Sequence, residues 1–120
     1  LPSITAGEDT PVHALLRSAS RPTAIVVSDD ILALTLERIC TETGLSIPAD
    51  LSILSFNNSL FARLTSPQLT SIDINSCQLG IEAAAQMISH IENPGLPATK
   101  ILVPHQLIER DSCARPASHE

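Results

Sequence analysis

Two pairs of polar residues stand where apolar segments of this chain end, and their side chains could bind a ligand. Asp29 and Asp30 follow the run AIVVS, and Asn57 and Asn58 follow the run SILSF. Carboxylates accept hydrogen bonds, whereas carboxamides both donate and accept them. If the two runs are neighbouring strands, the four side chains line one sheet edge and suit a ligand rich in hydroxyl groups.

Each pair also has a purely structural explanation. Asp29 or Asp30 could cap the helix that follows, because an Asp side chain accepts from the free N–H groups of a first turn. Asn57 and Asn58 could form a turn, because Asn tolerates left-handed backbone angles. Spacing alone leaves both alternatives open. The sequence predicts no catalytic residues, because no nucleophile or general base stands in a telling pattern.

A third feature is the apolar trio Leu60, Phe61 and Leu64, which follows the second polar pair. Its spacing fits one face of a short helical turn. The trio could pack back onto the edge of the sheet, or it could form an exposed patch that marks a partner surface.

Alternating helical and apolar patterns predict the elements that position these residues. Helices are expected from Pro11, with Thr10 as its cap, from Asp30 to Gly44, and from Asn75 or Ser76 to Pro94. Strands buried on both faces are expected before each polar pair. Further strands are expected at 1–6 and 69–74, and two short ones are expected on either side of Pro104. The fold class is therefore α/β, with a mostly parallel sheet and helices on both faces.

Composition narrows the function classes. The chain has 120 residues, a formal net charge of −6 and no basic stripe, which argues against direct binding of nucleic acid by these residues. No apolar run is long enough to span a membrane. Three unpaired cysteines predict a reducing, cytoplasmic compartment and no disulfide. The histidine and cysteine spacings predict no metal site, and no phosphate-binding loop indicates a cofactor.

Several motifs taken together resemble the LacI family of bacterial transcription regulators. They are RPTAIVVSDD, GLSIPADLSILSF, the following polar pair, SPQLTSI, a helix with Leu79 and Gly80, and the closing LIERDSC. The resemblance covers 21–113. It implies the effector-binding core of that family, which has two lobes like those of type I periplasmic binding proteins, with the effector between them.

The resemblance implies roles for individual residues. Asp29 and Asn57 correspond to effector contacts, and Ser76, at the start of the long helix, is predicted as a third. The family usually has Asn at the first position and Asp at the second, so this chain inverts the pattern and its ligand cannot be copied from a relative. The run SFNNS also resembles maltose-operon repressors, which suggests maltose or a maltodextrin as the effector.

The resemblance also implies a homodimer and a division into lobes. The predicted interface residues are Asp30, Leu34, Leu60, Phe61 and Leu64. The predicted boundaries assign 1–73 and 106–120 to the C-terminal lobe and 74–105 to the other lobe.

The family's helix-turn-helix, hinge and most of its first lobe are not in this sequence, so operator DNA would be bound only through a domain absent here. Effector binding by this chain alone is expected to be weak or absent. The helix carrying Leu79, Ala83 and Met87 is expected to associate with a partner or to be disordered. The alternative function is a periplasmic sugar-binding protein of a transport system; an enzyme on the same sheet lacks any motif in its favour.

Overall fold

The chain is described by a computed structural model over residues 11–116. Within these residues the elements, in chain order, are α1 (Pro11–Arg17), β1 (Ala24–Val26), α2 (Asp30–Thr43), β2 (Ser52–Phe56), α3 (Leu60–Leu64), β3 (Thr70–Asp73), α4 (Ser76–Glu92) and β4 (Gln106–Ile108). The strand predicted at 1–6 and the predicted cap Thr10 lie outside the described residues.

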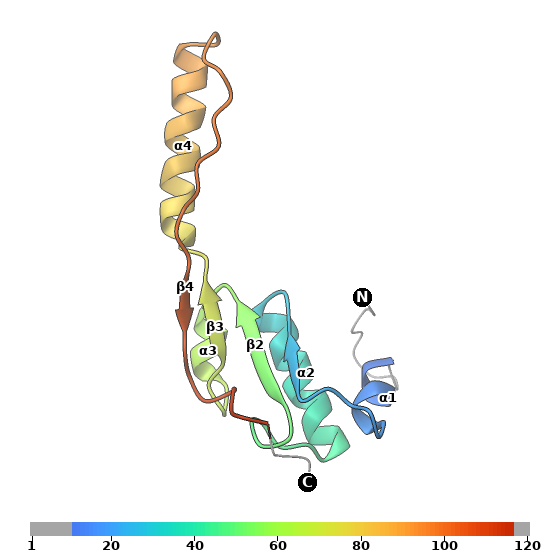
Figure 1. The fold of residues 1–120 in the computed structure, drawn as a ribbon. Helices are drawn as coiled ribbons and strands as arrows, with labels where there is room; N and C mark the ends of the chain where they lie inside the picture. Colours follow the sequence, from blue (N-terminus) through green and yellow to red (C-terminus); the bar gives the residue numbers. More distant parts are fainter. Residues whose placement is uncertain (1–10, 117–120) are drawn as a thin grey trace.

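The four strands form one sheet in the order β1-β2-β3-β4 (Figure 1). β1, β2 and β3 run parallel, and β4 pairs antiparallel to β3. The α/β fold with a mostly parallel sheet is therefore confirmed. Figure 1 shows α2 and α3 behind the sheet, and contacts between α2 and β2 and between α2 and α3 place these helices over one face.

The local signals at the ends of α2 act as expected. Asp29 is the N-cap, and its Oδ1 accepts from the backbone N–H of Leu32 at 2.8 Å. Gly44 follows the helix with φ of 75°, a left-handed angle that costs glycine little. The N–H of Leu45 then donates to the carbonyl of Cys40 at 2.8 Å, which closes the helix end.

An aliphatic cluster between the sheet and its helices forms the core, as the near absence of aromatic residues predicts. Its buried members are Val12, Leu16, Val27, Ala33, Leu36, Ile39, Cys40, Leu51, Ile53, Ala62 and Leu69. β1 differs from the expectation of a strand buried on both faces, because Val26 is 62% exposed. Within residues 11–116, β1 pairs with β2 alone, so its other edge has no neighbouring strand there.

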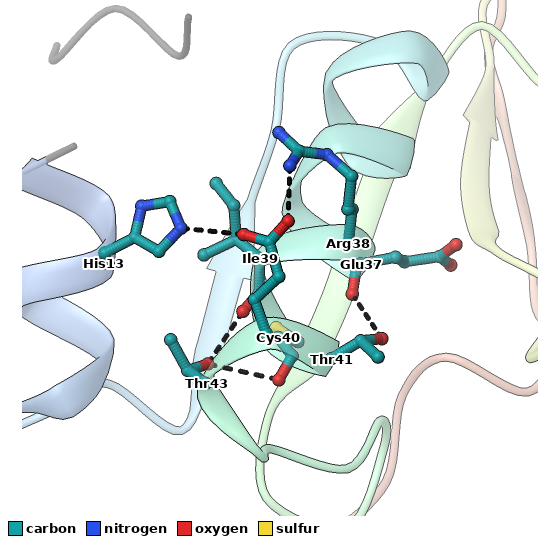
Figure 2. A network of polar contacts seen from close by, with 8 residues as sticks. His13, Glu37, Arg38, Ile39, Cys40, Thr41 and Thr43 are labelled. Atoms are coloured by element: carbon teal, nitrogen blue, oxygen red, sulfur yellow. Dashed lines mark hydrogen bonds and ion pairs between the residues drawn. The ribbon is translucent and has the colours of Figure 1, made fainter. Parts of the chain in front are cut away.

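Polar contacts join α1 to α2 outside this cluster (Figure 2). Nε2 of the buried His13 lies 3.0 Å from a carboxylate oxygen of Glu42, whose other oxygen accepts from Arg38. The neighbouring Glu37 points away from these contacts, and only its main-chain carbonyl is bonded in the view, to Thr41. These contacts hold α1 against α2.

The segment that follows β4 is hydrogen-bonded to the amino ends of the two central strands, β2 and β3. The hydroxyl of Ser112 donates to the carbonyl of Ile53 at 2.6 Å and accepts from the N–H of Thr70 at 2.8 Å. The N–H of Ile53 also donates to the carbonyl of Ser112 at 2.9 Å. Ser112 therefore bridges the starts of β2 and β3, although it lies far from both in sequence.

α4 and the segment at 93–105 form an arm that extends away from the sheet (Figure 1). No residue of α4 is buried, and Leu79 and Met87 are exposed. The segment is helical rather than disordered, while its association with a partner stays a prediction. The strand expected before Pro104 does not form among the described residues, because that segment runs beside α4 with no strand to pair with.

Candidate functional site

The carboxyl ends of β1, β2 and β3 lie at the same edge of the sheet, since the three strands are parallel. Asp29, Asn57 and Ser76 each follow one of these strands within three residues. The structure therefore brings the three predicted effector-binding positions to one edge, from which the arm also departs (Figure 1). Such edges are the usual ligand sites of open α/β sheets.

Asp29 is already partly engaged in the structure. Its Oδ1 caps α2 through Leu32, and its Oδ2 lies 3.5 Å from the hydroxyl of Ser28. The helix-capping explanation for this residue is confirmed. The side chain is half-buried, and Oδ2, whose contact with Ser28 is the longer one, has more capacity than Oδ1 to accept from a ligand.

Asn57 and Asn58 both adopt positive φ angles, 94° and 46°, so the turn explanation is confirmed for the pair. The N–H of Asn57 donates to the carbonyl of Ile72 at 2.8 Å, which anchors the turn to β3. Its side chain is exposed, and it makes no hydrogen bond within residues 11–116. Asn57 is thus held by its backbone and free at its amide group.

Asn58, in contrast, uses both polar atoms of its amide group inside the protein. Its Nδ2 donates to Oδ2 of Asp73 at 2.9 Å, and its Oδ1 accepts from the Arg110 guanidinium at 2.6 Å. The hydrogen bond from Asn58, followed by one from the Asn75 N–H, lowers the pKa of Asp73 below its ordinary value. Asn58 and Asn75 thus both donate to Asp73, the last residue of β3, where the chain leaves the sheet.

Sequence reasoning missed Asp73 and Arg110. The available signal for Asp73 was its place at the end of a strand, like the polar pairs before it. No local pattern indicates Arg110, because its partner Asn58 lies 52 residues away in sequence.

Asp30 lies in the interior, with 1% of its surface exposed. Burial alone raises its pKa, but hydrogen bonds from Ser55, Ser59 and Ser71 together lower it below the ordinary value. Asp30 was predicted at the dimer interface; because it is buried within its own chain, it cannot present its carboxylate to a second subunit. The other predicted interface residues differ: Leu34 is half-buried, and Leu60, Phe61 and Leu64 are 63%, 45% and 69% exposed.

An open hollow of about 390 Å³ lies beside the crossover between the sheet and the arm. Its lining residues are Asp73, Asn75, Pro104, His105 and Gln106. Asp73 and Gln106 also pair in the register of β3 and β4, so the chain leaves and re-enters the sheet at one level. Ser76 begins α4 next to this hollow, and its exposed side chain completes the edge.

Within the described part of the chain, no cluster of three potential metal ligands occurs. None of the helices described is both long and apolar enough to cross a membrane. All three cysteines are free; Cys40 is buried, and burial raises the pKa of its thiol to about 11, while Cys77 and Cys113 are exposed.

Comparison with known proteins decides the family. The family profile of the periplasmic binding protein-like domain matches residues 3–113. The chain belongs to this family. The periplasmic binding protein-like domain is also 35% identical over 103 residues to the HTH-type transcriptional repressor PurR of Pectobacterium carotovorum, a match that covers 86% of this chain and 30% of the relative.

Solved structures show the same relationship. The domain is similar to a protein of Bacillus cereus subsp. cytotoxis described as a LacI transcriptional regulator, with a TM-score of 0.82 and 38% identity over 86% of this chain and 36% of that one. It is also similar to a LacI family transcriptional regulator from Enterococcus faecium with bound ribose, with a TM-score of 0.77 and 31% identity over 89% of this chain and 39% of that one. The domain thus corresponds to part of the effector-binding core of such regulators, and spans about a third of their length.

Proposed function

We propose that this chain is the effector-binding and dimerisation part of a LacI-family transcription regulator. In this proposal a small molecule binds between two lobes and alters the affinity for operator DNA of a helix-turn-helix domain that lies outside these residues. The matched relatives and solved structures are named as transcription regulators, which supports a regulator in the cytoplasm over a periplasmic transport protein and over an enzyme.

The observation that carries the proposal is the state of Asn57. Its backbone is held by Ile72 in a left-handed turn, while its amide group projects free at the carboxyl edge of the sheet. A ligand could therefore bond this amide without breaking any hydrogen bond found within residues 11–116. Asp29 and Ser76 lie at the same edge and add a carboxylate and a hydroxyl.

These groups suit a sugar as the effector. Ring hydroxyls both donate and accept, and Asn57 offers both functions while Asp29 accepts. Ribose is bound in the Enterococcus faecium relative, which supports the sugar class for this chain as well. Maltose or a maltodextrin is the more specific proposal, and it rests on the sequence run SFNNS.

The proposed mechanism uses the crossover at Asp73 and Gln106. Residues up to 73 and from 106 would move as one lobe, and residues 74–105 as part of the other. A ligand that contacts both Asn57 and Ser76 would bind a closed arrangement more tightly than an open one, and so shift the population toward closure. The exposed leucines and phenylalanine of α3, together with Leu34, would carry the change to a second subunit.

Titration of the isotope-labelled chain with ribose and with maltose, followed by amide chemical shifts, tests the proposal even when binding is weak. We expect the amides of Asp29, Asn57 and Ser76 to shift with either sugar, and Asn57→Ala to reduce these shifts. Asn93→Ala is the matched control, because Asn93 is an exposed asparagine at the far end of α4. Shifts that are absent with every sugar, or that persist in Asn57→Ala, would contradict the proposed site.

A further inference from the structure

The buried carboxylate of Asp30 bonds to groups from three elements other than its own helix. Oδ1 accepts from the hydroxyls of Ser55 in β2, at 2.5 Å, and Ser71 in β3, at 3.0 Å. Oδ2 accepts from the backbone N–H of Ser59, the N-cap of α3, at 2.6 Å. One side chain at the start of α2 therefore ties together both central strands and the beginning of α3.

Ser71 extends this network to the crossover. While its hydroxyl donates to Asp30, its oxygen accepts from the N–H of Asn58 at 3.0 Å. Asn58 in turn bonds to Asp73, which accepts from the N–H of Asn75. Asp30 is thus connected by hydrogen bonds to both residues that follow Asn57 and to the N-cap of α4.

Besides the bonds from Asp30 and Ser71, the turn between the proposed ligand contact and the apolar helix is held by the Asn57 N–H, which donates to Ile72, and by the amide group of Asn58. Ser59 makes no side-chain capping bond to α3, and its hydroxyl is buried without a partner among the described residues. The two preceding residues hold left-handed angles, which non-glycine residues adopt only when their surroundings enforce them. The bonds from Asp30 and Ser71 are the ones that hold the backbone N–H groups of Ser59 and Asn58, so they supply a distinct part of this restraint.

We propose that Asp30 is a positioning residue for both the effector edge and the α3 surface. Its carboxylate fixes residues 57–59, so that ligand affinity at Asn57 and dimer affinity at Leu60, Phe61 and Leu64 depend on the same buried group. This inference rests on the proposed function and goes beyond it, because Asp30 itself touches neither the ligand nor the second subunit. The carboxylate of Asp30 accepts through both of its oxygens at once, from Ser55, Ser59 and Ser71. The amide group introduced by Asp30→Asn would have only one accepting oxygen.

The test compares Asp30→Asn and Ser71→Ala with the matched control Ser112→Ala. Ser71 and Ser112 are both fully buried hydroxyls bonded within the same sheet, but Ser112 lies at its opposite end. All three variants are expected to lose stability. Only the first two should raise the hydrogen exchange rates of the Asn58 and Ser59 amides relative to that of Leu54, by about tenfold.

Two further measurements on the same variants separate positioning from general destabilisation. For Asp30→Asn we expect the dissociation constants for ribose or maltose and for the dimer to rise about fivefold or more, the lower range of site-to-site coupling. Ser112→Ala should leave both constants unchanged under conditions in which all variants are folded. The ligand constant comes from chemical-shift titration, and the dimer constant comes from sedimentation velocity.

The outcomes distinguish this inference from the proposed function. If the unaltered chain binds neither sugar, the proposed effector class fails. The amide exchange rates and the dimer dissociation constant still test whether Asp30 positions residues 57–59. If Asp30→Asn and Ser112→Ala change the exchange of Asn58, Ser59 and Leu54 in the same proportion, Asp30 only stabilises the fold and the inference is overturned. Unchanged exchange at Asn58 and Ser59 in Asp30→Asn overturns it as well.

Discussion

The guanidinium of Arg110 donates to Oδ1 of Asn58 at 2.6 Å and to the carbonyl of Leu69 at 2.8 Å. Asn58 donates through Nδ2 to Asp73, so the loop after β2, the start of β3 and its end are connected through two side chains. The return of the chain after β4 thus braces the turn that presents Asn57. Asn58 provides the structural support, whereas the exposed amide group of the adjacent Asn57 makes no hydrogen bond among the described residues.

Loss of this brace should reduce stability. Arg110→Lys keeps the charge but cannot bond both acceptors with a planar fork, so we expect the free energy of unfolding to fall by about 1–2 kcal/mol. Asn58→Ala should cost a similar amount, and the double variant should cost less than the sum. Urea denaturation measures all three. Arg115→Lys, an exposed arginine near the end of the described chain, serves as control; strict additivity of the two changes would show that the bond contributes nothing.

Substitution at Asn57 can separate its backbone role from its side-chain role. Asn57→Gly should keep the stability of the protein, because glycine adopts a φ of 94° without strain. Asn57→Ala should lower the free energy of unfolding by about 1 kcal/mol, the cost of a strained positive φ. Both variants should weaken the sugar-induced amide shifts equally and leave the dimer intact. Full ligand response in Asn57→Gly would assign the residue to the turn alone.

Stability should depend on pH through Glu37. Desolvation by burial raises its pKa from 4.5 to about 7, and Oε1 has no hydrogen-bond partner within the described residues. The folded state therefore binds the proton more tightly than the unfolded state. The resulting stability is fully present below about pH 4.5 and is lost as the pH rises through about 7.

Glu37→Gln should remove this contribution to the pH dependence. At pH 8 the variant should be more stable than the unaltered chain by about 1–2 kcal/mol, a value reduced for the partial exposure of the group. Thermal or urea unfolding of both proteins from pH 4 to 8 measures the difference. Glu109→Gln, at an exposed carboxyl, is the control. A difference between Glu37→Gln and the unaltered chain that does not change with pH would contradict the raised pKa.

Two exposed leucines discriminate between the possible association surfaces. Leu64 on α3 is 69% exposed, and Leu102 beside α4 is 82% exposed. If α3 forms the dimer, Leu64→Glu should raise the dimer dissociation constant at least about tenfold, as loss of a well-packed interface residue does. Leu102→Glu should then have little effect. Sedimentation velocity measures the dimer dissociation constant of both variants. A large increase for Leu102→Glu with little change for Leu64→Glu would place the association surface on the arm.

The sequence by itself determined the fold class, most element boundaries and the polar positions at the carboxyl edge of the sheet. These features depend on short-range rules: apolar runs for strands, Asp29 and Gly44 at the ends of α2, and positive φ angles suited to Asn57. The aliphatic core and the short helix at Leu60 also follow from local composition and spacing.

Only the tertiary structure decided which side chains are buried and which distant residues they bond to. Asp30 stands beside Asp29 in sequence, but successive residues at a helix start point in different directions, and one carboxylate caps the surface while the other is buried among Ser55, Ser59 and Ser71. The same applies to Asn58, which bonds to Arg110 from 52 residues away. Such partners are joined by chain topology rather than by local pattern. Within residues 11–116, the outer edge of β1 and the segment before Pro104 lack a partner strand for the same reason: a strand requires a neighbour that only the assembled sheet can supply.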